Sequence, residues 1–153
     1  MKTLPLINLM SIMHLTCLSL WGGVVATEAV VELYPFRRPE LHPIAAAYHY
    51  WIDLLVELPL ILLVLATGLT LAILAWPLSS LHLLKIAAAL LAVSSNLYCI
   101  LLVLRRGRLT DPAAILPLTR RIIMCAVVGL PFATVAAGAG FWLAYQRLVE
   151  LIG

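Results

Sequence analysis

The chain has 153 residues, of which 64% are hydrophobic and only 11% are charged, and its formal net charge is +3. Soluble domains carry about 25% charged residues, so this composition excludes an ordinary soluble protein. Several apolar runs reach the roughly 20 residues that a membrane-spanning helix needs. The sequence therefore predicts a single all-α membrane domain over residues 1–153, an up-down-up-down four-helix bundle with spans at about 4–33, 50–76, 81–104 and 122–146.

Basic residues near the ends of the spans predict the orientation, because Lys and Arg are enriched in cytoplasmic connections. Three basic residues, Lys2, Lys85 and Arg147, fall at the end of the bundle that holds the termini. We therefore expect both termini on the non-cytoplasmic side of a bacterial-type inner membrane. An isoelectric point near 9.0 then needs no nucleic-acid partner. The connections at 34–49 and 105–121 hold the other seven basic residues, namely Arg37, Arg38, Arg105, Arg106, Arg108, Arg120 and Arg121.

The first span, residues 4–33, contains a polar stripe. Its members fall within about 40° of one direction on a helix that turns about 100° per residue. Ionisable groups in hydrocarbon face a bundle interior or a water-filled cavity. The first helix is therefore expected to form one wall of a polar interior that binds a cofactor. The stripe consists of His14, Trp21, Glu28 and Glu32.

The second span follows a proline-rich connection, YPFRRPELHP (34–43), which is typical of a stiff turn. It opens with AYHYWIDLLVELP, in which His49, Asp53 and Glu57 repeat every four residues and share one side of a helix. Pro59 follows and lacks an N–H donor, so it is expected to kink the helix.

Residues of the first two spans form a predicted acidic cluster, because both helices meet at the same turn and so place these groups at a similar depth. Facing carboxylates repel unless a proton or a metal neutralises them. A set of oxygen and nitrogen ligands suits Fe, Mn or Zn better than Cu(I). Two alternatives stay open: a hydrated extension whose carboxylates pair with the loop arginines, and a proton path or quinone head-group site. The candidate metal ligands are Glu28, Glu32, His49, Asp53 and Glu57.

The third span begins after a short link, so the second and third helices are expected to be antiparallel neighbours. His82 and Lys85 lie near its start, at the same end of the bundle as His14. A neutral imidazole among apolar residues is a natural axial ligand for haem iron, and an amine could be a second ligand or a proton carrier. The alternative is that Lys85 reaches back to the membrane surface and His14 only hydrogen-bonds a carbonyl.

The fourth span, 122–146, has almost no ionisable residues. Gly129, Ala133 and Ala137 repeat every four residues, which is typical of a close-packing helix face in membranes. We expect this face to pack within the bundle or against other membrane subunits or a second copy of the chain. The preceding segment, 109–121, is expected to lie along the membrane surface.

Several short segments resemble a superfamily of four-helix membrane proteins that includes the copper-resistance D membrane domain and the HemJ-type protoporphyrinogen oxidases. The resemblance implies a haem b protein in which His14 and Lys85 are the pair associated with the haem and with activity, and a porphyrin as a candidate partner. The acidic Glu28 and Glu32 and the HYWID segment depart from that pattern. The matching segments are MHLTCLSLWGG, LILLVLATGLTLA, LHLLKIAAALL and TRRIIMCAVVGLPFATVAAGA.

Three functions therefore stay open. The first is a haem b membrane redox protein, doing electron transfer or a HemJ-like oxidation, with His14, His82 and Lys85 at the cofactor and Lys85 as the candidate catalytic residue. The second is a metal-handling protein of the copper-resistance type, with an Fe, Zn, Mn or Cu ion at the acidic cluster. The third is a small non-catalytic subunit of a larger membrane complex. Whether the chain is an enzyme is left open.

Overall fold

The computed structural model describes residues 3–109 and 111–152, and these residues are almost entirely helical. Four helical stretches are long and apolar enough to cross a membrane, namely Leu6–Leu33, His42–Leu74, Ser80–Arg106 and Ala113–Gln146. The predicted all-α class, and four helices long and apolar enough to span a membrane, are thereby confirmed for the described residues. The elements are α1 (Thr3–Leu33), the short turns η1 (Tyr34–Phe36) and η2 (Pro39–Leu41), α2 (His42–Ile52), the π-helical turn η3 (Asp53–Glu57), α3 (Leu58–Leu74), α4 (Ser80–Arg106) and α5 (Pro112–Ile152).

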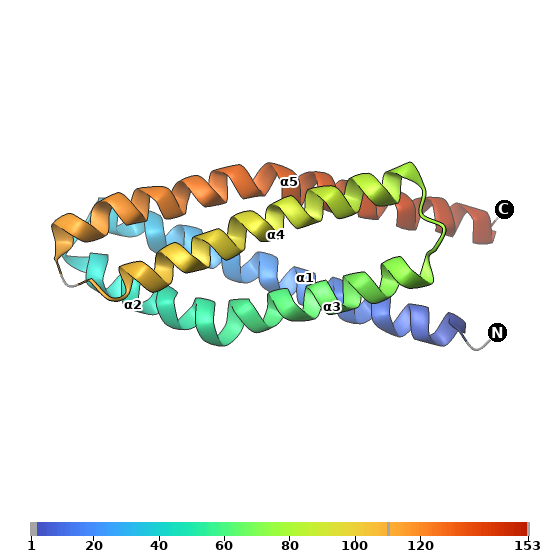
Figure 1. The fold of residues 1–153 in the computed structure, drawn as a ribbon, viewed down its shortest axis with the longest axis horizontal. Coiled ribbons are helices and arrows are strands. Elements are labelled where there is room, and N and C mark those ends of the chain that lie inside the picture. Colours follow the sequence, from blue (N-terminus) through green and yellow to red (C-terminus); the bar gives the residue numbers. More distant parts are fainter. Residues whose placement is uncertain (1–2, 110, 153) are drawn as a thin grey trace.

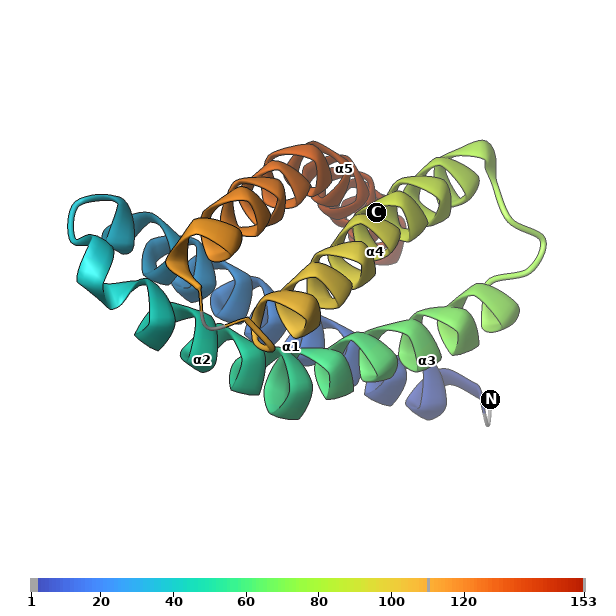
Figure 2. The same cartoon turned by 60° about the vertical axis from the view of Figure 1, so that its left-hand side comes forward.

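Successive spans run in opposite directions (Figure 1). The start of α1 and the end of α5 lie at one end of the molecule, together with the link between α3 and α4. The turns from α1 into α2 and from α4 into α5 lie at the other, which we call the connection end. Two helix pairs make most of the tertiary contacts: α4 packs along α5, and α1 packs along α3 (Figure 2).

Two helices begin earlier than the sequence predicts. The second span begins at His42 rather than near residue 50, with Pro43 in its first turn, where proline is tolerated. The fourth span begins at Pro112 rather than at 122, so the segment expected to lie along the membrane surface forms the first turns of α5 instead. Asp111 explains this start, because its Oδ1 accepts the N–H of Ala113 at 2.9 Å and satisfies a donor at the helix terminus.

The expected kink at Pro59 takes the form of a π-helical turn. The N–H of Leu58 bonds the carbonyl of Asp53, five residues back. Pro59 has no N–H to offer the carbonyl of Leu55, so the regular ladder cannot continue here. The wider turn inserts one extra residue and keeps the helix continuous from α2 into α3. Such turns occur frequently at functional sites.

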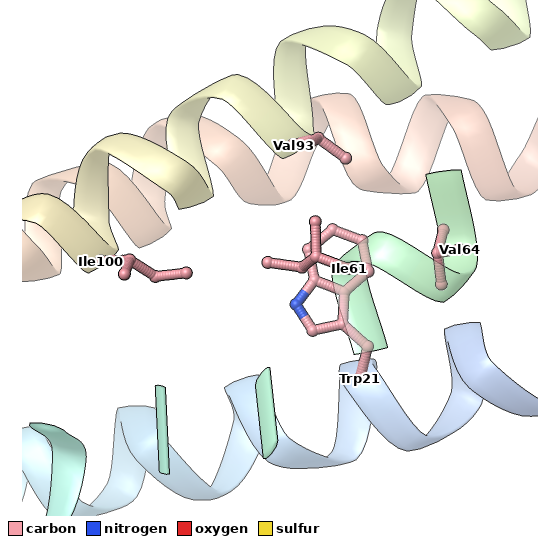
Figure 3. Close-up of a cluster of buried hydrophobic side chains, with 5 residues drawn as sticks. All are labelled: Trp21, Ile61, Val64, Val93 and Ile100. Carbon is pink, nitrogen blue, oxygen red and sulfur yellow. The ribbon is translucent and has the colours of Figure 1, made fainter. Parts of the chain in front are cut away.

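A small apolar core fills the middle of the bundle between three helices. Figure 3 shows it built from α1, α3 and α4 around the indole of Trp21. Large apolar side chains elsewhere point outward, among them Leu62, Leu69 and Val127, which are more than half exposed. This distribution is the one expected where lipid surrounds the helices. The core residues are Trp21, Ile61, Val64, Val93 and Ile100.

Candidate metal centre

The polar stripe of α1 faces the interior, as the sequence predicts. Among the described side chains of α1, the buried ones are Trp21, Glu28 and Glu32, and each belongs to the stripe. His14, the fourth member, is half-buried. An apolar helix that buries its carboxylates and exposes its leucines is inverted relative to a helix of a soluble protein. The interior of this bundle is therefore polar toward the connection end.

Five elements contribute to one buried polar cluster at this end. Asp53 has no exposed surface, and the other acidic members are at most 5% exposed. The predicted cluster therefore does form. It comprises Glu28 and Glu32 from α1, His49 from α2, Asp53 and Glu57 from the π-helical turn, Arg106 from α4 and Thr119 from α5.

Glu28, His49 and Asp53 could hold a metal ion, because one ligand atom from each lies within 4.8 Å of the others. The Nε2 atom of His49 is 3.3 Å from Oδ1 of Asp53 and 3.7 Å from Oε2 of Glu28. Both carboxylate oxygens of Asp53, and Oε1 of Glu28, are buried without a hydrogen-bond partner. Buried polar atoms are satisfied in the great majority of cases, so these orphaned acceptors call for an unseen partner.

Glu32 positions the imidazole of His49 and is not one of the three candidate metal ligands. One of its oxygens accepts a hydrogen bond from Nδ1 of His49. Its carboxylate is held by the guanidinium of Arg106, whose Nη1 donates to Oε2 at 2.7 Å and also to the hydroxyl of Thr119 at 3.0 Å. A carboxylate on one nitrogen of an imidazole fixes the tautomer and leaves the other nitrogen to bind a metal. Here that other nitrogen is Nε2, which faces Glu28 and Asp53.

Glu57, the last predicted ligand, already has its own partners. Its Oε1 accepts hydrogen bonds from Nε1 of Trp21 at 2.8 Å and from Nδ2 of Asn96 at 2.7 Å. These bonds tie the π-helical turn to α1 and α4. Glu57 therefore borders the candidate site and stabilises its walls.

The cluster contains more acidic than basic groups. Four carboxyl groups surround one guanidinium and one imidazole. Because Glu32 is matched by Arg106, the surplus falls on the other three carboxyls. A divalent cation beside His49 would balance most of this surplus and supply partners for the orphaned oxygens. The burial of these carboxyl groups does not fit the alternative of a hydrated extension. One part of that alternative, the pairing of a carboxylate with a loop arginine, is present between Glu32 and Arg106.

Sequence reasoning missed Arg106, Thr119 and Asn96. It read Arg106 as a charge at a helix end, which is the usual place of an arginine that sets topology. Thr119 belongs to no helix face with an obvious chemical pattern. Asn96 lies on roughly the same face of its helix as His82 and Lys85, which associates it with the other cluster. The available signal was indirect: buried carboxylates at one end of a bundle need a cation at the same depth.

The other predicted cluster lies toward the termini, on separate helices. Nδ1 of His14 on α1 is 2.9 Å from the hydroxyl of Thr67 on α3. Lys85 on α4 is half-buried and lies against Gly140 of α5. His82 lies in the first turn of α4, where its Nδ1 and backbone N–H both bond the cap residue at position 79.

Comparisons with known proteins do not assign the chain to a family. No protein-family model matches the chain, and no curated protein and no solved structure matches it significantly. The resemblance to the copper-resistance D and HemJ-type superfamily stays a prediction from short motifs.

Proposed function

We propose that this chain is a metal-binding membrane protein that holds one divalent first-row transition ion between Glu28, His49 and Asp53. The observation that carries the proposal is Asp53, which is wholly buried, has no hydrogen-bond partner for either oxygen, and lies 3.3 Å from Nε2 of His49. A buried carboxylate is expensive, so it is kept where a cation or a proton accompanies it.

The donor set favours Fe²⁺, Mn²⁺ or Zn²⁺. One imidazole nitrogen and two carboxylates are borderline-to-hard ligands, whereas Cu(I) prefers sulfur. The nearest buried thiol, Cys99, instead contacts the carbonyl of Ile122. Three protein ligands leave coordination positions open for water or a substrate, as in catalytic rather than structural sites. This supports metal handling or metal-assisted chemistry over a purely structural ion.

The direct test is the metal content of detergent-purified protein, measured by mass spectrometry after loading and gel filtration. We expect about one ion per chain. Asp53→Asn keeps the shape of the side chain and removes the ligand charge, so it should lose the ion. Glu40→Gln is the matched control, because Glu40 is an exposed carboxylate of the α1–α2 connection, and it should retain the ion.

Retention of a full complement of metal by Asp53→Asn would refute the proposal, as would absence of metal from the wild-type protein. Glu28→Gln removes a second ligand from a different helix. It should give the same loss while elution volume and circular dichroism stay those of the wild type. A variant that loses the ion yet keeps the fold separates binding from folding.

A second candidate function, haem binding at His14, is favoured by one hydrogen-bond arrangement. The hydroxyl of Thr67 donates to the carbonyl of Leu63 at 2.6 Å, so it accepts from Nδ1 of His14. The proton then sits on Nδ1, and Nε2 has a lone pair for an iron ligand. Lys85 would be the second ligand or proton carrier.

An absorption spectrum tests this candidate separately from the metal site. A haem protein of this kind shows a Soret band that disappears in His14→Ala and persists in His42→Ala, a histidine outside both clusters. An unchanged band in His14→Ala would remove His14 as the ligand.

A further inference from the structure

Three exposed arginines lie on the outside of the bundle at the connection end. Arg105 belongs to α4, and Arg120 and Arg121 belong to the neighbouring α5. The two helices run side by side (Figure 1), and the 3.0 Å bond between Arg106 and Thr119 sets the register between them. The three arginines therefore lie within about one helical turn of the same height. We call Arg105, Arg120 and Arg121 the arginine ledge.

The charge of the ledge is not matched within the protein. None of its guanidinium groups forms an ion pair within the part of the chain that the structure describes. The exposed acidic residues described at this end are Glu40 and Asp111, and both lie on the connections between spans rather than along them. One carboxylate oxygen of Asp111 already caps α5. The surplus positive charge therefore calls for an anionic partner from outside the chain.

The length of α5 places the ledge at the depth of lipid head groups. Toward the other end of this helix, Trp142 and Tyr145 are more than half exposed, as is typical of aromatic residues at a membrane surface. Arg121 and Trp142 are roughly 20 residues apart, which corresponds to about 30 Å along a helix. The hydrocarbon core of a bilayer has the same thickness, about 30 Å. A bilayer with one surface at Trp142 therefore has its other surface at the ledge.

The helix faces beside the ledge favour a lipid over a soluble anion. Leu101 lies about one turn before Arg105 on α4, and Met124 lies about one turn after Arg121 on α5. Both positions are toward the middle of the bundle, and residues three or four apart share a helix face. Leu101 and Met124 are more than half exposed. An acyl chain can therefore contact them while its phosphate contacts the arginines.

The kind of basic residue agrees with a phosphate ligand. All seven basic residues of the connection end are arginines, and both lysines of the chain lie elsewhere. Lysine and arginine serve equally in the charge bias that sets the orientation of a membrane protein. Arginine differs because its planar fork of N–H donors matches a phosphate group in bidentate geometry. Recognition of phosphate accounts for this preference, and orientation alone does not.

We propose that the arginine ledge binds an anionic phospholipid from the membrane leaflet at the connection end. The guanidinium groups hold its phosphate, and an acyl chain lies against Leu101 and Met124. This inference is independent of the proposed metal centre. The ledge is exposed on α4 and α5, whereas the candidate metal ligands are buried on α1, α2 and the π-helical turn.

The test uses full-length protein in phosphatidylcholine vesicles, with spin-labelled phosphatidylglycerol or spin-labelled phosphatidylcholine as the probe. Electron paramagnetic resonance separates lipid held at the protein from free lipid and gives the relative affinity of the two probes. We expect phosphatidylglycerol to be preferred about fivefold or more, because a single arginine near the membrane surface contributes about that much. The preference should fall as the salt concentration rises. Equal affinity for the two probes would overturn the proposal.

Two double variants with the same change in charge provide the decisive comparison. Arg120→Gln/Arg121→Gln takes two charges from the ledge and should remove most of the preference. Arg37→Gln/Arg38→Gln takes two charges from the turn between α1 and α2, where both side chains are exposed, and should keep most of it. Equal losses in the two variants would mean that only the overall charge attracts lipid, which would overturn the ledge as a site.

A soluble competitor separates a lipid from a free phosphate. Glycerol 3-phosphate carries the phosphate without acyl chains, so an excess should leave the spin-labelled phosphatidylglycerol in place. Its displacement would assign the ledge to a soluble phosphate and contradict the proposal. Protein treated with chelator should show the same lipid preference as untreated protein, so failure of the metal proposal would leave this result standing.

Discussion

At the scale of single residues, Arg106 links the polar interior together. It donates to Glu32, which in turn holds His49, and it reaches Thr119 on a fourth helix. Removing one partner of a buried ion pair leaves an uncompensated charge, whereas replacing both partners with apolar side chains is often neutral. The energetic role of Arg106 therefore differs from that of the exposed arginine beside it.

We expect Arg106→Met to lower the free energy of unfolding by about 3–5 kcal/mol, because the carboxylate of Glu32 stays buried without its cation. The double variant Glu32→Met/Arg106→Met should recover most of that loss. Arg105→Met is the control: Arg105 is exposed, and its replacement should change stability by no more than about 0.5 kcal/mol. Chemical unfolding in detergent measures all three, and equal effects of the two arginine variants would contradict a structural ion pair.

The residues that the sequence could identify are those whose burial is costly. Hydropathy places Glu28 and Asp53 inside apolar spans, and the cost of a carboxylate in hydrocarbon predicts that they turn inward. The sequence does not show which residue each of these carboxylates contacts. The contact between Glu32 and Arg106 joins residues 74 positions apart, and nothing in the local pattern of either helix specifies that pairing.

At the scale of elements, the π-helical turn positions two of the buried carboxyl groups. It carries Asp53 at its first residue and Glu57 at its last. The extra residue in the turn rotates everything on one side of it by about 100° relative to a regular helix. The sequence predicted a disturbance at Pro59 but could not specify its kind, because a missing N–H is compatible with either a bend or a wider turn.

Pro59→Ala restores the missing donor and should allow a regular α-helical turn. The regular turn would rotate α2, which carries His49 and Asp53, relative to α3, against which α1 packs. Glu28 of α1 would then no longer face the other two ligands, so metal binding should fall by about tenfold or more while helix content stays unchanged. Metal titration with circular dichroism measures both. Pro131→Ala, a proline within α5 and away from the cluster, should bind metal as the wild type does. Normal binding by Pro59→Ala would show that the turn is not required.

At the scale of the whole molecule, hydropathy predicts the number of membrane-spanning helices but not which of them pack side by side. Apolar runs of sufficient length fix how many helices can cross a membrane. Which helices lie side by side depends on close contacts such as that of Gly129 with Ser95. Many other small residues of the chain could have made equivalent contacts, so the sequence does not specify the pairing. The predicted excess of basic residues at the connection end is kept with one change. Arg106 is buried inside the bundle, and the other six arginines of the connection end are exposed.

That bias predicts the orientation of the protein when it is expressed in a bacterial inner membrane. Exposed arginines at the connection end should hold it in the cytoplasm. A green fluorescent protein fused after Arg108 should therefore fluoresce, and alkaline phosphatase fused after Gly153 should be active. The reverse pattern would contradict the predicted orientation without affecting the interior site.

The central claim, a metal ion bound by Glu28, His49 and Asp53, is tested most directly by X-ray absorption spectroscopy of the metal-loaded protein. The predicted spectrum has a first shell of oxygen and nitrogen at about 2.0–2.2 Å for a zinc-like ion, with scattering from a single imidazole. The imidazole contribution should disappear in His49→Ala. Sulfur at about 2.3 Å, two or more imidazoles, or a spectrum indifferent to His49→Ala would contradict the account.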